Sequence, residues 1–305
     1  TETEELPYED TALTLDLEPG PPPERFTVEH LLYLYGRRLI AVLPTELAPF
    51  PVPVQPGPVL RDQLIEWNIL DSTGTSLAPD AEELLTALSC GWVFAVWGQT
   101  RFPARTFTQH LDIPAEAADW GLFPTTDIVP RIPFLVAAHE QETIAAVSTP
   151  EALLTSRMPR RKGRDHEVDV ADELRHLLDP AEVWSPSPRP RIRVRRTLID
   201  ALTAHPILGS VTTEYTERTV RAEMAKLAED HHLSVATVDT LLELVTAPVA
   251  AVTQWVVSVT TATGTVTSQG SGGAVLFHGD GTATVTYPVT SGPVDDVIFE
   301  PATTE

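Results

Sequence analysis

The side chains that could do chemistry in this chain of 305 residues are scattered, and none of their spacings is that of an active site. Asp165-His166-Glu167 with His176 is the closest approach to a metal-ligand set, and His231-His232 is the only pair of adjacent histidines. Neighbouring residues on a helix point about 100° apart, so an adjacent pair rarely binds one metal ion. We therefore expect no metal site, and we expect the nine histidines to lie mostly on the surface.

Two residues that could act as nucleophiles also lack a suitable context. Ser271 sits in Gln269-Gly-Ser-Gly-Gly273, but a nucleophile elbow needs a helix after the serine, and here more strand follows. The segment is more typical of a glycine-rich hairpin or bulge. Cys90, the only cysteine, excludes a disulfide framework and a cysteine-based zinc site, and we expect it in the core. With no phosphate-binding glycine motif either, we expect no catalytic residue, no cofactor and no enzyme activity.

The charge balance argues against several classes of partner. The chain has 43 acidic and 21 basic residues, a formal net charge of −22, and a field of that sign repels nucleic-acid phosphates. Residues 216–246 outwardly match a helix-turn-helix, but the second helix has no Arg or Lys, which favours a packed helical hairpin. No apolar run approaches the roughly 18–20 residues of a membrane span, and no signal-peptide pattern opens the sequence. We expect a cytoplasmic protein that neither binds nucleic acid nor inserts into membranes.

Hydrophobic periodicity predicts helices and strands in a repeated order. Helices are expected at residues 26–38, 59–69, 80–88, 165–178, 197–204, 216–230 and 235–246. Strands are expected at residues 39–43, 92–97, 134–138 and 143–147, and a C-terminal meander at 255–260, 265–268, 273–278 and 282–287. Each half thus runs from a helix into antiparallel strands, which indicates two similar halves that share one sheet with helices packed at either side.

Composition divides the chain into four parts. Residues 1–24 form an acidic, partly flexible tail, and residues 25–156 form an N-terminal α+β half. Residues 157–196 carry eleven of the 21 basic residues and several prolines, which is typical of an insert or linker, and residues 197–305 form the C-terminal α+β half. The basic run from Arg189 to Arg196 is suited to contact an acidic surface, the protein's own included.

A long connection, residues 99–133, is broken by five prolines yet is rich in aromatic and aliphatic residues. Long segments without regular structure are uncommon in compact domains, and many of those that occur are functional. Two interpretations stay open. Either the connection folds back onto the domain surface, or it forms an arm that binds a partner.

The C-terminal stretch resembles that of a known family. Five segments carry the resemblance, in this order: Leu241–Pro248, Trp255–Thr260, the Thr263-Gly264 turn, Gly272–Phe277 and Gly281–Pro288. Together they resemble the closing half of the EspG proteins of actinobacterial type VII (ESX) secretion. In the first half, Phe26–Leu43 and Leu64–Leu88, with Ile69-Leu70-Asp71, Gly74 and Pro79, are similar to the family's opening elements. Two features depart from the family pattern: no amphipathic helix follows the last strand, and the loop between the second and third strands is longer.

The resemblance implies both a fold and a function. The fold is α+β, a central antiparallel β-sheet flanked by two helical bundles, with pseudo-two-fold N- and C-terminal halves. Family members are cytosolic, non-enzymatic chaperones that bind the apolar helical tip of PE–PPE heterodimers and keep these secreted substrates soluble for export. Shielding such a tip requires an apolar, aromatic surface rather than a catalytic cleft. In the family, the loop after the second strand and the C-terminal helices make this contact, which here points to Phe102, Phe107, Ile113, Trp120, Phe123, Val220, Met224 and Leu227.

Two other hypotheses stay open. The protein could be a non-catalytic regulatory or scaffold protein, for example a homodimer, whose basic insert docks an acidic partner. It could also be an enzyme of a type that the sequence does not reveal. An exposed apolar patch on the long connection would favour the chaperone, a self-complementary patch the homodimer, and a deep pocket with convergent polar groups the enzyme.

Overall fold

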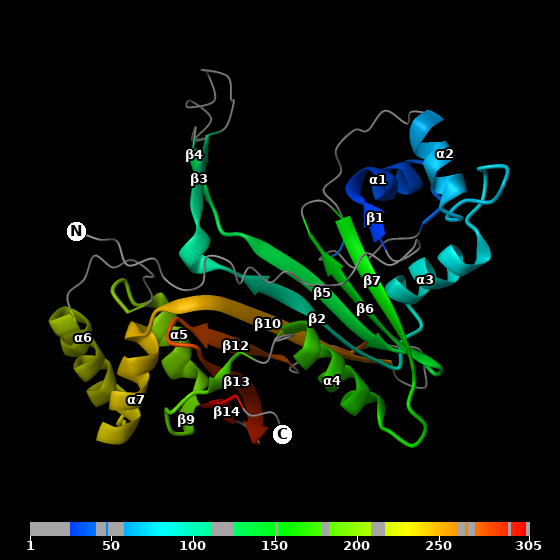
Figure 1. Ribbon diagram of the computed structural model, residues 1–305. Coiled ribbons are helices and arrows are strands. Elements are labelled where there is room, and N and C mark those ends of the chain that lie inside the picture. Colours follow the sequence, from blue (N-terminus) through cyan, green and yellow to red (C-terminus); the bar gives the residue numbers. More distant parts are fainter. Residues whose placement is uncertain are drawn as a thin grey trace. The chain divides into compact units, whose positions relative to one another are not determined.

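The computed structural model describes residues 25–40, 47, 58–110, 125–149, 152–178, 183–208, 217–260, 266–267, 272–291 and 294–302 (Figure 1). Its helices are α1 (Val28–Gly36), α2 (Pro58–Glu66), α3 (Pro79–Ser89), the 3-10 turn η1 (Pro103–Arg105), α4 (His166–Leu178), α5 (Arg196–Ala204), α6 (Glu217–Asp230) and α7 (Val235–Thr246). Its strands are β1 (Arg25–Thr27), β2 (Phe94–Arg101), β3 (Phe107–His110), β4 (Thr125–Ile128), β5 (Arg131–Ala138), β6 (Glu142–Ser148), β7 (Ala152–Pro159), β8 (Ser185–Pro186), β9 (Ile192–Arg195), β10 (Val249–Thr260), β11 (Val266–Thr267), β12 (Gly272–His278), β13 (Thr282–Ser291) and β14 (Val294–Pro301). Within these ranges, no helix has both the length and the apolar character needed to cross a lipid bilayer.

The strands form one main sheet and one small one. In the described part of the chain, the main sheet has the order β1-β7-β6-β5-β2-β10-β12-β13-β14-β9, with β11 paired to β10 and β8 paired in parallel to β13. Strands β3 and β4 form a separate two-stranded sheet. The predicted fold class, α+β with a central antiparallel sheet and two groups of helices, is confirmed.

Contacts along the chain divide the protein into two compact units, each made from three segments. Unit 1 comprises Thr1–Gly98, Ile132–Glu182 and Val257–Ser268, and unit 2 comprises Gln99–Arg131, Val183–Val256 and Gln269–Glu305. Strands β2 and β10 therefore contribute residues to both units. The predicted boundaries of tail, halves and insert stay a prediction, and the structure describes α4, β8 and β9 inside residues 157–196.

The core of unit 1 lies between helices α1–α3 and one face of the strands. Its buried members include Leu31, Leu34, Leu84, Leu88, Leu135 and Ile144. Local residues satisfy the first N–H groups of two of these helices. The Thr27 side chain accepts a hydrogen bond from the His30 N–H at the start of α1, and Pro79, which has no N–H group, opens α3. The apolar stripe of each helix can then pack on the sheet.

The central strands of unit 1 are buried on both faces. In β5, Leu135 packs in the cluster with α1–α3, whereas Phe134 and Val136 point the other way and are also fully buried. Helices α3 and α4 both contact β6. This burial explains why β5 and β6 appear in the sequence as continuous apolar runs rather than as alternating ones.

Unit 2 has a core of its own. Its buried members include Ile192 and Val194 of β9, Leu198 and Leu202 of α5, Met224 of α6, and Leu241 and Leu244 of α7. Helix α7 begins at Ser234, whose hydroxyl accepts a hydrogen bond from the Thr237 N–H at 3.2 Å. The predicted helical hairpin of residues 216–246 is thus confirmed as α6 and α7 packed together.

Polar side chains pair across β2 and β10. The Thr100 and Thr253 hydroxyls lie 2.8 Å apart in a buried position, and Trp97 Nε1 donates to Ser258 Oγ at 2.9 Å. The Thr260 N–H donates to the Val93 carbonyl at 3.1 Å. Because a buried polar group without a partner costs about 1–3 kcal/mol, these pairs hold the two strands in one antiparallel register.

Strand β14 was missed by the sequence analysis, because Asp295 and Asp296 disfavour a strand. In the structure Arg193 of β9 binds Asp296 through Nε and Nη2, both at 2.6 Å, and Arg191 Nε lies 3.1 Å from Glu300 Oε2. Ion pairs between neighbouring strands offset the low strand propensity of the acids. The expectation that the basic run of residues 189–196 contacts the protein's own acidic surface is confirmed.

Several expectations about single residues were wrong. Cys90 is exposed rather than in the core, because α3 ends at Ser89 and Cys90 follows as its C-cap. His30 and His278 are buried, and they are exceptions to the expectation that the nine histidines lie mostly on the surface. Leu39 and Ile40 follow α1 outside any strand, and the rest of the predicted strand, residues 41–43, lies outside the described residues.

Gly272 and Gly273 open β12 directly against Trp255 of β10. A Cβ on Gly272 would lie 2.5 Å from the Trp255 carbonyl oxygen. A Cβ on Gly273 would lie 2.7 Å from the Thr286 carbonyl oxygen and 2.8 Å from the Trp255 ring. Gly272 and Gly273 are therefore needed for close backbone approach, while residues 268–271 lie outside the described residues.

Gly273→Ala is expected to lower the free energy of unfolding by about 1–3 kcal/mol, because the new methyl group overlaps the Thr286 carbonyl oxygen on one side and the Trp255 ring on the other. Gly36→Ala is the matched control, since a Cβ there meets no atom within 4 Å. That control should be neutral or stabilise by up to about 1 kcal/mol. Urea denaturation of both variants tests this, and equal effects would contradict the close packing at Gly273.

His30 makes stability depend on pH. It belongs to α1 and its ring contacts α2, with Nδ1 2.8 Å from Thr27 Oγ1 and Nε2 3.3 Å from Gln63 Oε1. Burial lowers the pKa of His30 below its ordinary value of 6.5, so the unfolded chain takes up a proton more readily than the folded one. Stability should therefore be complete above about pH 6.5 and fall as the pH drops towards the folded-state pKa.

Urea denaturation at about pH 7.5 and about pH 5.5 measures this loss. His30→Gln should make it smaller, although burial also lowers the pKa of His139 and His278. An unchanged pH dependence in the variant would show that His30 does not contribute.

Candidate functional site

The long connection between β2 and β5 contains a two-stranded ribbon, β3 and β4 (Figure 1). The strands pair antiparallel from Phe107 opposite Ile128 to His110 opposite Thr125. At its base the Phe102 N–H donates to the Pro130 carbonyl at 3.0 Å. The described part of the connection is therefore regular structure, and it forms its own sheet instead of extending the main one. We call this segment the β3–β4 ribbon.

Of the five predicted contact residues in this connection, the structure describes the side chain of Phe102. That ring is half-buried, and the Arg105 guanidinium lies over it at 5.5 Å from the ring centroid. Phe107 belongs to β3, but its side chain lies outside the described residues, as do Ile113, Trp120 and Phe123 entirely. Val129 directly follows β4, and its apolar side chain is 39% exposed to solvent.

The second predicted group lies on α6. Met224 is fully buried, and Val220 and Leu227 are half-buried against the same apolar cluster, which includes residues of α5 and α7. The structure thus brings these three side chains together, but on the inner side of the hairpin. There they hold α6 in place, and a partner can reach Met224 only if α6 moves. Their role in binding a partner stays a prediction.

The outer side of the α6–α7 hairpin is mainly charged. Lys226 Nζ lies 2.6 Å from Glu223 Oε1, and His205 Nε2 lies 3.6 Å from Glu223 Oε2. The hydrogen bond from Lys226 is the main reason that the pKa of Glu223 lies below its ordinary value. Among the described residues, α7 also has two exposed apolar side chains that are far apart along the helix, Val235, which is 78% exposed, and Val245.

A surface hollow of about 590 Å³ lies in unit 1, beside α3 and the turn between β5 and β6. Four of its eleven lining residues are glutamates, and Arg157 links two of them, at 3.0 Å to Glu83 and 2.7 Å to Glu142. Its side chains include Glu82, Glu83, Thr86, Cys90, His139, Glu140 and Glu142. The sequence gives no signal for this hollow, because acids on a helix and in a hairpin turn are typical of an ordinary solvated surface.

A second cavity, of about 240 Å³, lies in unit 2 at the C-terminal end of α7. Arg189, Glu243 and His278 line it, and the sequence analysis had noted only the first of them, as part of the basic run. In the part of the chain that the structure describes, no group of three or more His, Cys, Asp or Glu side chains is placed to hold a metal ion.

Comparison with known proteins supports the fold. No family model and no curated protein matches the sequence. The structure is similar to the solved structure of the Mycobacterium tuberculosis type VII secretion system chaperone EspG5 in complex with a PE25-PPE41 dimer, with a TM-score of 0.61. The match covers 92% of this chain and 90% of that chain, at 13% sequence identity. The likeness to the EspG proteins seen in the sequence is therefore confirmed at the level of the fold.

Met224→Ala is expected to lower the free energy of unfolding by about 2–5 kcal/mol, because it removes a buried side chain from the core of unit 2. Glu229→Ala, on the exposed side of the same helix, should change it by no more than about 0.5 kcal/mol. Urea denaturation of both variants tests the assignment. If both variants match the wild type, Met224 is not part of the core and is free to contact a partner.

Proposed function

We propose that this protein is a type VII (ESX) secretion-associated chaperone of the cytoplasm. It binds a helical secreted substrate of the PE–PPE class, shields the apolar tip of that substrate and keeps it soluble for export. The observation that carries the proposal is the fold match over 92% of the chain to a structure of EspG5 with a PE25-PPE41 dimer. Since one fold can serve many functions, the proposal also needs a surface that suits such a client.

The β3–β4 ribbon and the connection that contains it are the proposed contact surface. Aromatic residues concentrate there, at positions 102, 107, 120 and 123. Large aromatic side chains are typical anchors of protein interfaces, since each buries a large area at a small cost in side-chain entropy. The ribbon also keeps its strands out of the main sheet, so its backbone is not committed to the core.

The negative charge of the protein favours clients whose surface is basic or neutral. The protein carries a formal net charge of −22, so a client with a basic or neutral rim around its apolar tip associates faster than an acidic one. The exposed acids of α7, Asp239 and Glu243, would lie towards such a rim if α7 takes part in the contact.

A pull-down from native cytosol tests the proposal. Wild type, Trp120→Ala/Phe123→Ala and Val59→Ala are compared, the last because Val59 is an exposed apolar residue of α2, outside the proposed surface. Wild type and Val59→Ala should enrich a small helical secreted protein. The double variant should bind the purified client at least about tenfold more weakly, because truncating central aromatic anchors costs more than about 1.4 kcal/mol.

Two outcomes would contradict the proposal. One is the absence of any secreted helical client although all three proteins are folded by circular dichroism. The other is a wild-type protein that sediments as a dimer which the double variant cannot form, which would favour the homodimeric regulatory protein instead.

A further inference from the structure

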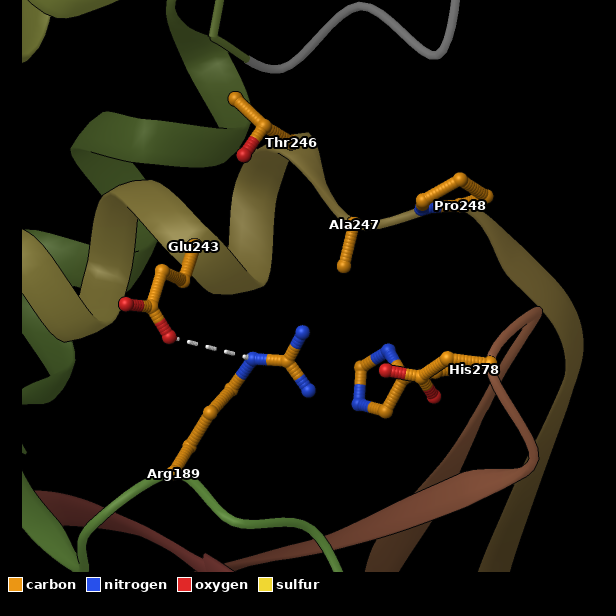
Figure 2. Close-up of a pocket in the computed structure, with 7 residues that line it drawn as sticks. Arg189, Glu243, Thr246, Ala247, Pro248 and His278 are labelled. Carbon is orange, nitrogen blue, oxygen red and sulfur yellow. Dashed lines mark ion pairs between the residues drawn. The ribbon is translucent and has the colours of Figure 1, made fainter.

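The cavity at the end of α7 is lined by three segments far apart in the sequence (Figure 2). Its lining residues are Arg189 from the loop before β9, Glu243, Thr246, Ala247 and Pro248 from α7 and the residues that follow, and His278 and Asp280 from the end of β12 and the next turn. The Gly279 N–H donates to the Pro248 carbonyl at 2.8 Å, which holds that turn against the end of α7. At about 30 Å³ per water molecule, a volume of 240 Å³ holds several waters or one small molecule.

His278 reaches this cavity with a nitrogen that has no partner. The residue is 1% exposed, and its Nε2 lies 2.9 Å from Thr284 Oγ1. Its Nδ1 is buried and makes no hydrogen bond to any described residue. When the Thr284 hydroxyl donates to Nε2, the neutral ring carries its proton on Nδ1 and offers an N–H group to the cavity.

Arg189 reaches the same cavity with an unused donor. Its side chain is 12% exposed, and Nη1 donates to Ser187 Oγ at 3.2 Å. Its Nε is buried and makes no hydrogen bond within the described residues. Each buried polar group left in this state costs about 1–3 kcal/mol, and more when charged, so an occupant that supplies acceptor oxygens is favoured.

Glu243 indicates which acceptor fits. Its Oε2 lies 3.7 Å from Arg189 Nε, an ion pair drawn as a dashed line in Figure 2 but too long for a hydrogen bond. The Glu243 side chain is 63% exposed, and pairs with so exposed a member contribute only about 0–1 kcal/mol. The Glu243 carboxylate is therefore only weakly bound to Arg189, and a ligand carboxylate that makes hydrogen bonds could take its place.

The other acid of the cavity is already engaged. Asp280 Oδ1 accepts from the Thr282 N–H at 3.0 Å and from the Thr282 hydroxyl at 2.7 Å. These bonds satisfy the Asp280 carboxylate within its own turn and lower its pKa. The negative charge of Asp280 in the lining disfavours a ligand that carries more than one negative charge, and its hydrogen bonds go to Thr282 rather than to Arg189 or His278.

We propose that this cavity binds a small monocarboxylate, one oxygen held by the Arg189 guanidinium and the other by the Nδ1–H of His278, in exchange for Glu243. Two-point contact with a guanidinium and a second donor is the geometry that planar carboxylates favour. The proposal does not rest on the chaperone function, since Arg189, Glu243 and His278 lie outside the β3–β4 ribbon and the connection that contains it. It does connect a ligand to α7, because Glu243 leaves its ion pair when the ligand enters.

Nuclear magnetic resonance on the ¹⁵N-labelled full chain tests the proposal. The side-chain signals of Arg189 Nε–H and of His278 are followed while sodium formate, acetate or propionate is added, with sodium chloride keeping the ionic strength constant. Saturable shifts of both signals at concentrations on the order of 1 mM to 10 mM are expected. Inorganic phosphate is the comparison, and tighter binding of phosphate than of every carboxylate would overturn the assignment of the ligand class.

Two substitutions on α7 should affect acetate binding differently. Glu243→Gln removes the internal competitor and should tighten acetate binding at least about threefold, whereas Asp239→Asn, an equal change of charge on the exposed side of α7, should leave it unchanged. Equal effects of the two variants, or no saturable shift up to about 100 mM acetate, would overturn the proposal.

Arg189→Met should abolish the shift of the His278 signal. If this variant does not fold by circular dichroism, Arg189→Lys replaces it, and acetate binding should weaken at least about tenfold because an ammonium lacks the planar fork. A His278 shift that persists unaltered in the folded variant would show that acetate binds elsewhere.

Discussion

The rest of the structure depends on the requirement that β2 and β10 satisfy each other's buried polar groups. The Thr100–Thr253 and Trp97–Ser258 pairs fix one antiparallel register, and both strands contribute to both compact units. That register sets the end of β2 beside the beginning of β10. The β3–β4 ribbon leaves the sheet just after Arg101, and the carboxylate cavity lies at Pro248, just before β10 begins. Both proposed surfaces are therefore positioned by the same end of this strand pair.

The likeness to EspG5 at 13% identity shows what kind of information the fold preserves. Burial patterns and strand order are enough to specify the sheet and its helices, because many apolar residues of similar volume can fill one core. Residues that contact a partner are under no such constraint. The proposed client surface therefore combines the region that the resemblance to the EspG proteins points to with side chains of this protein, namely the aromatic residues of the long connection.

The α6–α7 hairpin illustrates the difference between an apolar residue and a binding residue. The spacing of Val220, Met224 and Leu227 identified one apolar side of α6, and the structure uses that side to pack against α5 and α7. What the hairpin shows to solvent is charged, with Glu223, Lys226 and Glu243 among its side chains. A partner of this surface would be recognised mainly through charge, whereas the apolar client that we propose would contact the ribbon.

The sequence by itself determined the elements whose signals are local. Caps, prolines and 3.6-residue periodicity placed α3 and α7 within a residue of their observed bounds, and two apolar runs around a polar turn placed the β5–β6 hairpin. The aromatic residues of the long connection could be named as candidates in the same way, although not their arrangement. Only the tertiary structure decided that Asp295 and Asp296 belong to a strand, because Arg193, which binds Asp296, is 103 residues away along the chain. Only it brought Arg189, Glu243 and His278 to one cavity, since long-range packing of three separate segments leaves no local pattern in the chain.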